Sequence, residues 1–162
     1  MEKERENEKQ QIADRMRQNF RMWEQMGYGP VCEESMQKIA GAASDGLLGS
    51  LKKREDKQRL CQESDRLRRY LDNYMAACQC YYLYRNLHAR TDRDTKTAVL
   101  LGDYFFGEFS HYLIPIDSPK LIRIFSERLQ METTENLPEN CSMEDYAAFI
   151  SRIPERFVEE LL

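Results

Sequence analysis

Apolar residues recur at three- and four-residue steps along most of the chain, which is the period of an α-helix. Residues 2–26 are rich in residue types that favour helices and carry one apolar stripe, made of Ile12, Met16, Phe20 and Trp23. Gly27 stands where the residue after a helix C-terminus belongs, and Gly29-Pro30 follows it. We therefore expect a charged N-terminal helix within residues 1–30, whose first part frays or projects because it has no apolar stripe.

The next two segments are also helical in pattern. Residues 31–48 form a weaker helix because two glycines interrupt it, and Gly49-Ser50 predicts a turn with Ser50 as an N-cap. Residues 51–90 contain no Gly or Pro, which predicts one long helix or two with a subtle break. Their first half is charged and their second half is aromatic and apolar. A helix of this kind passes from solvent into a core or into a partner.

The most apolar segment, residues 96–113, is predicted to be a helix with Asp94 or Thr95 as its N-cap and Pro115 after its end. Apolar residues surround nearly its whole circumference, so we expect it to be buried in a domain interior or between subunits. Asp103 is the exception within it. A carboxylate in such surroundings needs hydrogen bonds or a cation, and we expect Asp103 to find them.

Two further helices complete the pattern. Ser118-Pro119 combines an N-cap serine with a proline at the first helical position. Ser142 opens a capping box before the last helix, and Pro154 lies inside that helix, where it should kink or restart it. No strand pattern bounded by turns is present. The predicted fold class is therefore all-α, a bundle of about six helices, with residues 31–162 as a single domain.

Composition narrows the classes of function. The chain has 162 residues, of which 41% are hydrophobic, enough for one domain with a core and too apolar for a disordered chain. No apolar stretch approaches the roughly 20 residues that a membrane span needs. The formal net charge of −4 argues against nucleic acid as a partner. The first residues contain no apolar signal segment, so we expect a cytoplasmic protein.

The residue types that carry catalytic or metal-binding chemistry form no known pattern. The five cysteines are irregularly spaced, and we interpret them as reduced, packed thiols. Cys78 and Cys80, the only close pair, lie about 200° apart on a helix and do not share a metal there without unwinding. His88 and His111 match no ligand pattern. We find no phosphate-binding loop or nucleophile elbow, and predict no catalytic residue and no metal site.

Residues 98–109 read AVLLGDYFFGEF, which resembles the A-V-L-x-G-D-Y/F helix of the trans-isoprenyl diphosphate synthases, the polyprenyl synthetase superfamily. The residues that match G-D-Y are Gly102, Asp103 and Tyr104. Residues 117–125 resemble the start of the helix that follows in the family, and residues 142–150 resemble its S-x-x-x-Y-x-x-x-I helix. The three segments occur in the family's order, within about residues 74–158.

The carboxylate clusters of the catalytic members are missing from this sequence. Those members carry a D-D-x-x-D motif upstream of the G-D-Y helix, which holds Mg²⁺ ions and, through them, the allylic diphosphate. Here residues 76–91 contain no carboxylate. Where the family has I-x-x-K-T, this chain has Ile150 followed by Ser, Arg, Ile153 and Pro154, and no second Asp-rich motif follows.

This combination resembles the small non-catalytic subunit (component I or component A type) of heterodimeric long-chain trans-polyprenyl diphosphate synthases. The resemblance implies a bundle like the N-terminal half of the isoprenoid synthase fold and a role in chain elongation and product length. It also implies a heterodimer or heterotetramer with a larger catalytic subunit, which alone would hold Mg²⁺, so that this chain needs no cofactor. The candidates that it implies for the partner interface or the prenyl-tunnel wall are aromatic: Tyr81, Tyr82, Tyr84, Phe105, Phe106, Phe109 and Tyr112.

Other interpretations stay open. A helical protein–protein interaction module unrelated to prenyl transfer would explain the long helices and the eight methionines. A lipid or prenyl carrier would use the aromatic helix as a pocket. A homodimer would cover the same apolar face with a second copy of the chain. For each aromatic candidate, ordinary core packing competes with an interface role.

Overall fold

The computed structural model describes residues 2–28, 33–58, 64–88, 95–134 and 143–157 of the chain. Within these residues the fold is all-α, as predicted, with six α-helices and no strand. The helices are α1 (Glu2–Trp23), α2 (Glu33–Gln58), α3 (Ser64–His88), α4 (Thr95–Leu113), α5 (Pro119–Thr134) and α6 (Met143–Phe157). Two short turns, η1 (Glu24–Tyr28) and η2 (Ile114–Ile116), follow α1 and α4. None of the described helices is long and apolar enough to cross a bilayer.

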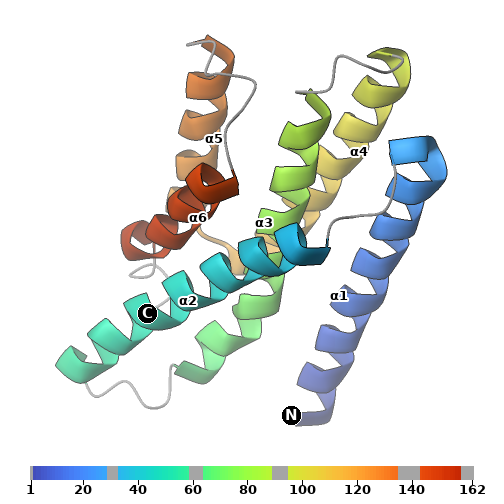
Figure 1. Cartoon of the computed structure of the whole chain (residues 1–162). Helices are drawn as coiled ribbons and strands as arrows, with labels where there is room; N and C mark the ends of the chain where they lie inside the picture. The colour runs from blue at the N-terminus through green and yellow to red at the C-terminus, as the bar shows by residue number, and fades with distance from the viewer. Residues whose placement is uncertain (1, 29–32, 59–63, 89–94, 135–142, 158–162) are drawn as a thin grey trace.

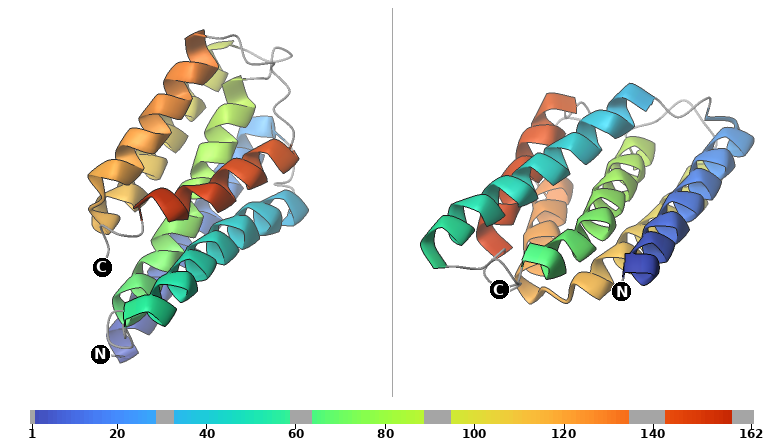
Figure 2. Two further views of the ribbon diagram at one scale, coloured as in Figure 1. Left: turned by 90° about the vertical axis from the view of Figure 1, so that its left-hand side faces the viewer. Right: turned by 90° about the horizontal axis from the view of Figure 1, so that it is seen from below.

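Helix α3 is the centre of the bundle (Figure 1). It runs beside α4, with which it forms the most extensive helix pair, and α2 crosses both α3 and α6. Helix α1 lies on one side of the α3–α4 pair, and α5 and α6 lie on the other (Figure 2). Because helices cover α3 from several directions, it contributes the centre of the core, with Tyr74, Ala77, Cys78, Cys80 and Tyr81 fully buried.

Two predicted helix boundaries are confirmed by backbone geometry. Gly27 has φ 85° and ψ 17°, the left-handed conformation that ends a helix and that glycine adopts without strain. At the start of α5, the backbone N–H of Leu121 donates to Oγ of Ser118 at 3.1 Å, which is the N-cap bond. Of the two N-cap candidates for α4, Thr95 is already the first residue of the helix, and Asp94 lies outside the described residues, as does Ser142.

The predicted turn at Gly49-Ser50 is wrong, because α2 continues through both residues to Gln58. Ser50 is buried in the middle of this helix and caps nothing. Ala43 and Leu47 are buried on the face of α2 that packs on α3 and α6. A glycine inside a helix costs about 1 kcal/mol of helix stability relative to alanine. The packing of α2 outweighs this cost. Residues 51–90 therefore contain the end of α2 and then α3.

Helix α6 continues past Pro154, so the predicted restart does not occur. Proline has no N–H, and the carbonyl of Ile150 therefore loses the donor that a helix normally supplies from four residues ahead. The buried hydroxyl of Tyr74 on α3 donates to this carbonyl at 3.0 Å. On α2, a Cβ at Gly46 would lie 2.6 Å from the carbonyl oxygen of Ser151. A hydroxyl from α3 and the close approach of α2 at Gly46 thus both contact the backbone of α6.

Candidate functional site

Helix α4 carries the G-D-Y segment, and within this chain it is buried on one side only. The buried residues of this helix are Leu101, Gly102, Phe105, Glu108, Phe109, Tyr112 and Leu113. Towards its N-terminal end, large apolar side chains are exposed on the opposite side: Leu100 by 62%, Val99 by 48% and Phe106 by 40%. The composition of this segment predicts burial on all sides. This chain covers only one side of the helix, and an apolar surface remains exposed.

The seven aromatic candidates fall into two groups. Four of them are buried in the core: Tyr81, Phe105, Phe109 and Tyr112. Tyr81 packs on Phe109 and Phe125, with ring centroids 5.5 and 5.1 Å away. Tyr82 and Tyr84 are half-buried, and Phe106 is exposed while its ring packs on that of Tyr84 at 5.4 Å. Only this second group reaches the surface of the chain.

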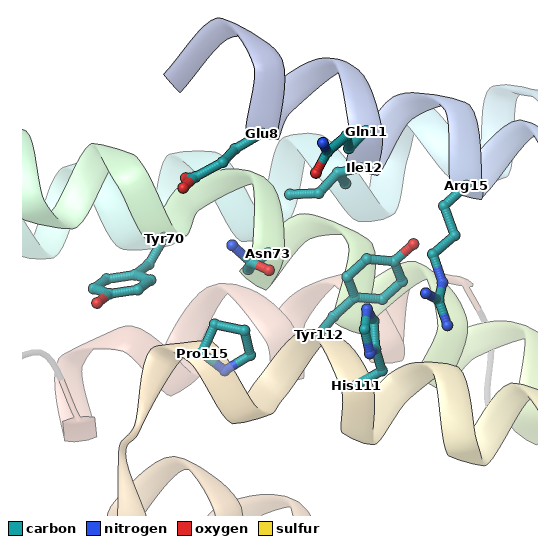
Figure 3. A pocket seen from close by; sticks show the side chains of 9 residues that line it. All are labelled: Glu8, Gln11, Ile12, Arg15, Tyr70, Asn73, His111, Tyr112 and Pro115. Atoms are coloured by element: carbon teal, nitrogen blue, oxygen red, sulfur yellow. The ribbon is translucent and has the colours of Figure 1, made fainter. Parts of the chain in front are cut away.

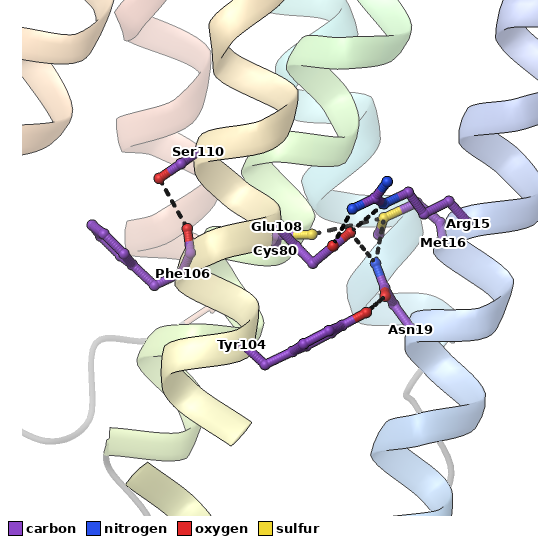
Figure 4. Close-up of polar contacts among 8 residues, drawn as sticks. All are labelled: Arg15, Met16, Asn19, Cys80, Tyr104, Phe106, Glu108 and Ser110. Atoms are coloured by element: carbon purple, nitrogen blue, oxygen red, sulfur yellow. Dashed lines mark hydrogen bonds and ion pairs between the residues drawn. The ribbon is translucent and has the colours of Figure 1, made fainter. Parts of the chain in front are cut away.

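The carboxylate that is buried with a cation and hydrogen bonds is Glu108, whereas Asp103 is exposed. The expectation for Asp103 is therefore wrong. Glu108 is 5% exposed and faces α1, where Arg15 donates to it from Nε at 2.8 Å and from Nη2 at 2.6 Å (Figure 4). Nδ2 of Asn19 adds a third hydrogen bond at 3.0 Å. This bidentate pair links α1 to α4 with defined geometry.

Tyr104 extends this polar cluster to the exposed side of α4. Its hydroxyl donates to Oδ1 of Asn19 at 2.6 Å, while Nδ2 of Asn19 donates to Glu108 (Figure 4). The fully buried amide of Asn19 is thus paired at both ends. Of the G-D-Y residues, Gly102 is buried, Asp103 is exposed and Tyr104 is held by a hydrogen bond.

The protonation states in this cluster follow from its contacts. Burial raises the pKa of Glu108, but the hydrogen bonds from Arg15 and Asn19 outweigh burial and hold the pKa below its ordinary value. Glu108 is therefore ionised at neutral pH. Burial raises the pKa values of the Cys78 and Cys80 thiols well above the ordinary range, so these two free cysteines stay protonated. They pack as side chains of the core.

The position of Glu108 in the sequence would have predicted that its carboxylate is buried in this cluster. It lies three residues after Phe105 and four before Tyr112, and therefore in the same helical stripe as these two buried residues. On α1, Arg15 and Asn19 are four residues apart and so share one face. A carboxylate in the buried stripe of one helix, and an Arg–Asn pair on one face of another, would have indicated the contact.

An exposed apolar surface is the remaining feature of α4. We call it the exposed α4 face, and it consists of Val99, Leu100, Tyr104, Phe106 and Gly107. Leu100, Tyr104 and Gly107 follow one another at steps of four and three residues, and Val99 and Phe106 are seven residues apart, so these residues lie together along one side of the helix. A Cβ at Gly107 would meet nothing within 4 Å, which leaves the helix backbone open to close approach. Clustered exposed apolar side chains of this kind mark binding surfaces.

Among the residues that the structure describes, no group of three or more His, Cys, Asp or Glu side chains is arranged to hold a metal ion. Comparison of the chain with protein-family models, with curated proteins and with solved structures found no match. The resemblance to the small subunits of prenyl diphosphate synthases therefore depends on the residues of the sequence alone.

Proposed function

We propose that this chain is a non-catalytic subunit of a heteromeric trans-prenyl diphosphate synthase and that it binds the larger catalytic subunit through the exposed α4 face. The observation that supports this proposal is that the G-D-Y segment and the open apolar surface lie on the same helix. The larger subunit would supply the Mg²⁺ sites and the chemistry of prenyl transfer. This chain would support chain elongation and influence product length.

The exposed α4 face has the composition of a partner interface. Aromatic and aliphatic side chains are enriched in the centres of such interfaces, where they become fully desolvated. The large exposed side chains of this face are Val99, Leu100, Tyr104 and Phe106. Tyr104 is held by Asn19, so one anchor is already ordered before binding.

The packing of the core limits where a prenyl chain would run in such a complex. Tyr81, Phe109 and Phe125 contact one another ring to ring, with all three centroid separations between 4.9 and 5.5 Å. Because these rings fill the space between α3, α4 and α5, we assign the proposed tunnel wall to the surface of α4. Phe106 and the half-buried Tyr84 are the aromatic candidates that remain for this role, because the half-buried Tyr82 packs on Tyr146 of α6 instead.

The proposal is tested by mixing the chain with the large prenyl synthase subunit of the same organism. Size-exclusion chromatography with light scattering measures the complex, and transfer of isopentenyl units to an allylic diphosphate measures activity. We expect a complex that is active when neither component is active alone. Prenyl transfer by the isolated chain would contradict the proposal.

Two matched variants locate the interface. Leu100→Glu introduces a charge on the exposed α4 face and should abolish complex formation, while the fold is retained because the side chain is mostly exposed. Ile122→Glu is the control, since Ile122 is a 49% exposed apolar residue on α5. A complex that tolerates Leu100→Glu as well as Ile122→Glu would refute the assignment of this face.

The second candidate function is a helical interaction module without a connection to prenyl transfer. The same exposed α4 face supports it, because an apolar helix surface suits many helical partners. The two functions predict different results in the mixing experiment. A module of this kind would show no complex with any prenyl synthase subunit, and a homodimer would be detected by light scattering of the chain alone.

A further inference from the structure

The exposed α4 face has a carboxylate at its centre. Asp103 is exposed, and the residues three and four positions before and after it are Val99, Leu100, Phe106 and Gly107, all of which belong to this face. Around the helix axis, at about 100° per residue, Asp103 lies between Phe106 and Val99 on one side and Gly107 and Leu100 on the other. Its carboxylate is therefore surrounded by the apolar surface and does not lie at its edge.

The two aromatic rings of the face lie on either side of Asp103. Tyr104 points from α4 towards α1, where its hydroxyl donates to Oδ1 of Asn19, and Phe106 points to the other side of α4 (Figure 4). There the ring of Phe106 packs on that of Tyr84. A partner that packs on both exposed rings therefore covers the carboxylate between them.

Asp103 has no counter-charge within the part of the chain that the structure describes. It forms no hydrogen bond or ion pair with any of these residues, so water alone solvates it in the free chain. A partner that covers the face removes this water, and transfer of a carboxylate from water without a compensating charge is costly. The surface that binds here must therefore bring a cation, an Arg or Lys side chain with apolar groups around it.

A second copy of this chain does not supply that cation. In a pair with two-fold symmetry the same surface packs on itself. If two copies of the exposed α4 face pack antiparallel about their common centre, Val99 faces Gly107, Leu100 faces Phe106, and the two Asp103 carboxylates face each other. Parallel packing in register also places the two carboxylates opposite each other. Like charges at close range repel each other, and most strongly where water is excluded.

A groove beside α1 is an alternative place for a partner. It has a volume of about 510 Å³ and lies between α1, α3 and the C-terminal end of α4 (Figure 3). It shares no residue with the exposed α4 face, and Gln11, Arg15 and Asn73 are among the polar side chains that line it. The exposed α4 face instead surrounds one charge with apolar side chains. An apolar surface with a single cation therefore matches the face, and the groove provides a control position.

We propose that Asp103 determines which partner the exposed α4 face accepts. An Arg or Lys side chain of the larger catalytic subunit pairs with the Asp103 carboxylate, and the same carboxylate prevents two copies of this chain from packing through this face. The identity of the partner rests on the proposed function. The exclusion of a second copy does not, because it follows from the charge and position of Asp103 alone.

Self-association of the isolated chain tests the exclusion of a second copy. Asp103→Asn removes the charge, and Asp103→Leu also makes the apolar surface continuous. Asp45→Asn, at an exposed carboxylate on α2, is the control. Analytical ultracentrifugation should show self-association that is about tenfold tighter or more for both Asp103 variants than for the native chain and the control, at an unchanged melting temperature. Equal self-association of all four proteins would overturn this part of the proposal.

Binding to the large prenyl synthase subunit of the same organism tests the pairing. Asp103→Asn should weaken the complex about tenfold or more, because the cation of the partner is then buried without its counter-charge. Asp103→Glu keeps the charge and should retain most of the affinity. Asp45→Asn and Gln11→Ala in the groove should bind like the native chain. Native affinity of Asp103→Asn would overturn the pairing, and so would a complex that only Gln11→Ala weakens.

Exchange of the two charges identifies the cation. Asp103→Arg should abolish the complex, and replacement of the contacting Arg or Lys of the large subunit by Glu should restore it. If no such replacement among the surface Arg and Lys residues of the large subunit restores binding, the pairing is wrong. A native chain that forms no complex with this subunit would refute the proposed function itself, whereas a native complex that tolerates Asp103→Asn would refute only the inference about Asp103.

Discussion

The Glu108 cluster gives the sharpest test of how α1 is held on α4. Glu108→Gln keeps the shape of the side chain and removes the charge. In the native chain the carboxylate accepts from two nitrogens of Arg15, at 2.8 and 2.6 Å, and from Asn19 at 3.0 Å. The amide of the variant offers one acceptor oxygen, and its NH₂ group faces further donors. At least one donor in the cluster therefore loses its partner.

The expected loss of stability follows from the exposure of the two partners. A hydrogen bond to a charged group contributes roughly 1.5–3 kcal/mol, and breaking a fully buried ion pair costs roughly 3–5 kcal/mol. The Arg15 side chain, however, is 44% exposed and is hydrated again when it is released. We therefore expect the free energy of unfolding to fall by about 2 kcal/mol, near the value of one charged hydrogen bond. In a chain of this size, that lowers the melting temperature by roughly 4–8 °C.

Urea unfolding followed by circular dichroism measures this difference, with an unchanged m-value if both proteins unfold from the same compact state. The control is Glu127→Gln, because Glu127 forms an exposed ion pair with Arg156 at 3.6 Å. An exposed pair of this kind contributes at most about 1 kcal/mol.

The pH dependence has a definite sign. The pKa of Glu108 lies below its ordinary value of 4.5 in the folded chain, so its contribution is complete above that pH and is lost as the pH falls through the folded-state pKa. The stability difference between the native chain and Glu108→Gln should therefore be constant from neutral pH to about 5 and should shrink below about 4.5. Equal urea midpoints at pH 7 would refute the reasoning, and a difference that persists unchanged in strong acid would refute its electrostatic part.

Three other contacts give predictions of stability. Tyr74→Phe should lower the free energy of unfolding by about 1–2 kcal/mol, because the carbonyl of Ile150 loses its donor; an unchanged denaturation midpoint would contradict this. Gly46→Ala should destabilise by about 1–3 kcal/mol, since its Cβ would meet the α6 backbone at 2.6 Å. Gly49→Ala, with nothing within 4 Å of the new Cβ, should instead stabilise by about 0.5–1 kcal/mol. Thermal unfolding of the two glycine variants should therefore show melting temperatures that shift in opposite directions. Ser118→Ala should cost about 1 kcal/mol through the lost N-cap, and Ser118→Asp should retain most of the stability in the same assay.

The helix ends that the sequence predicted correctly are those decided by one or two residues. Gly27 and Ser118-Pro119 determine their local backbone through steric freedom, a missing N–H and a side-chain acceptor. The predicted turn at Gly49-Ser50 was wrong because a helix break at this dipeptide depends on what the rest of α2 contacts. Packing on α3 and α6 keeps α2 helical through this dipeptide, and one sequence alone does not display these contacts.

The candidate site was predicted in part for a related reason. The sequence identified α4 as the unusual helix, but it did not reveal which side of α4 faces α3 and α1. That rotation decides that Asp103 is exposed and Glu108 is buried, although both lie in the same apolar segment. It also decides that Phe105 is in the core while its neighbour Phe106 is exposed. Burial of single side chains follows from the pairing of helices, which composition does not specify.

The hydrogen bond from Tyr74 to the carbonyl of Ile150 makes positions 74 and 154 depend on each other during evolution. While residue 154 is proline, the hydroxyl at position 74 is the donor to that carbonyl, and a chain without it is less stable. Once Pro154 is replaced, its new N–H supplies the carbonyl and the hydroxyl becomes dispensable. Substitution of Pro154 before loss of the hydroxyl therefore avoids the less stable intermediate that the reverse order passes through. The order in which these two residues are replaced during evolution therefore matters, although they lie on different helices.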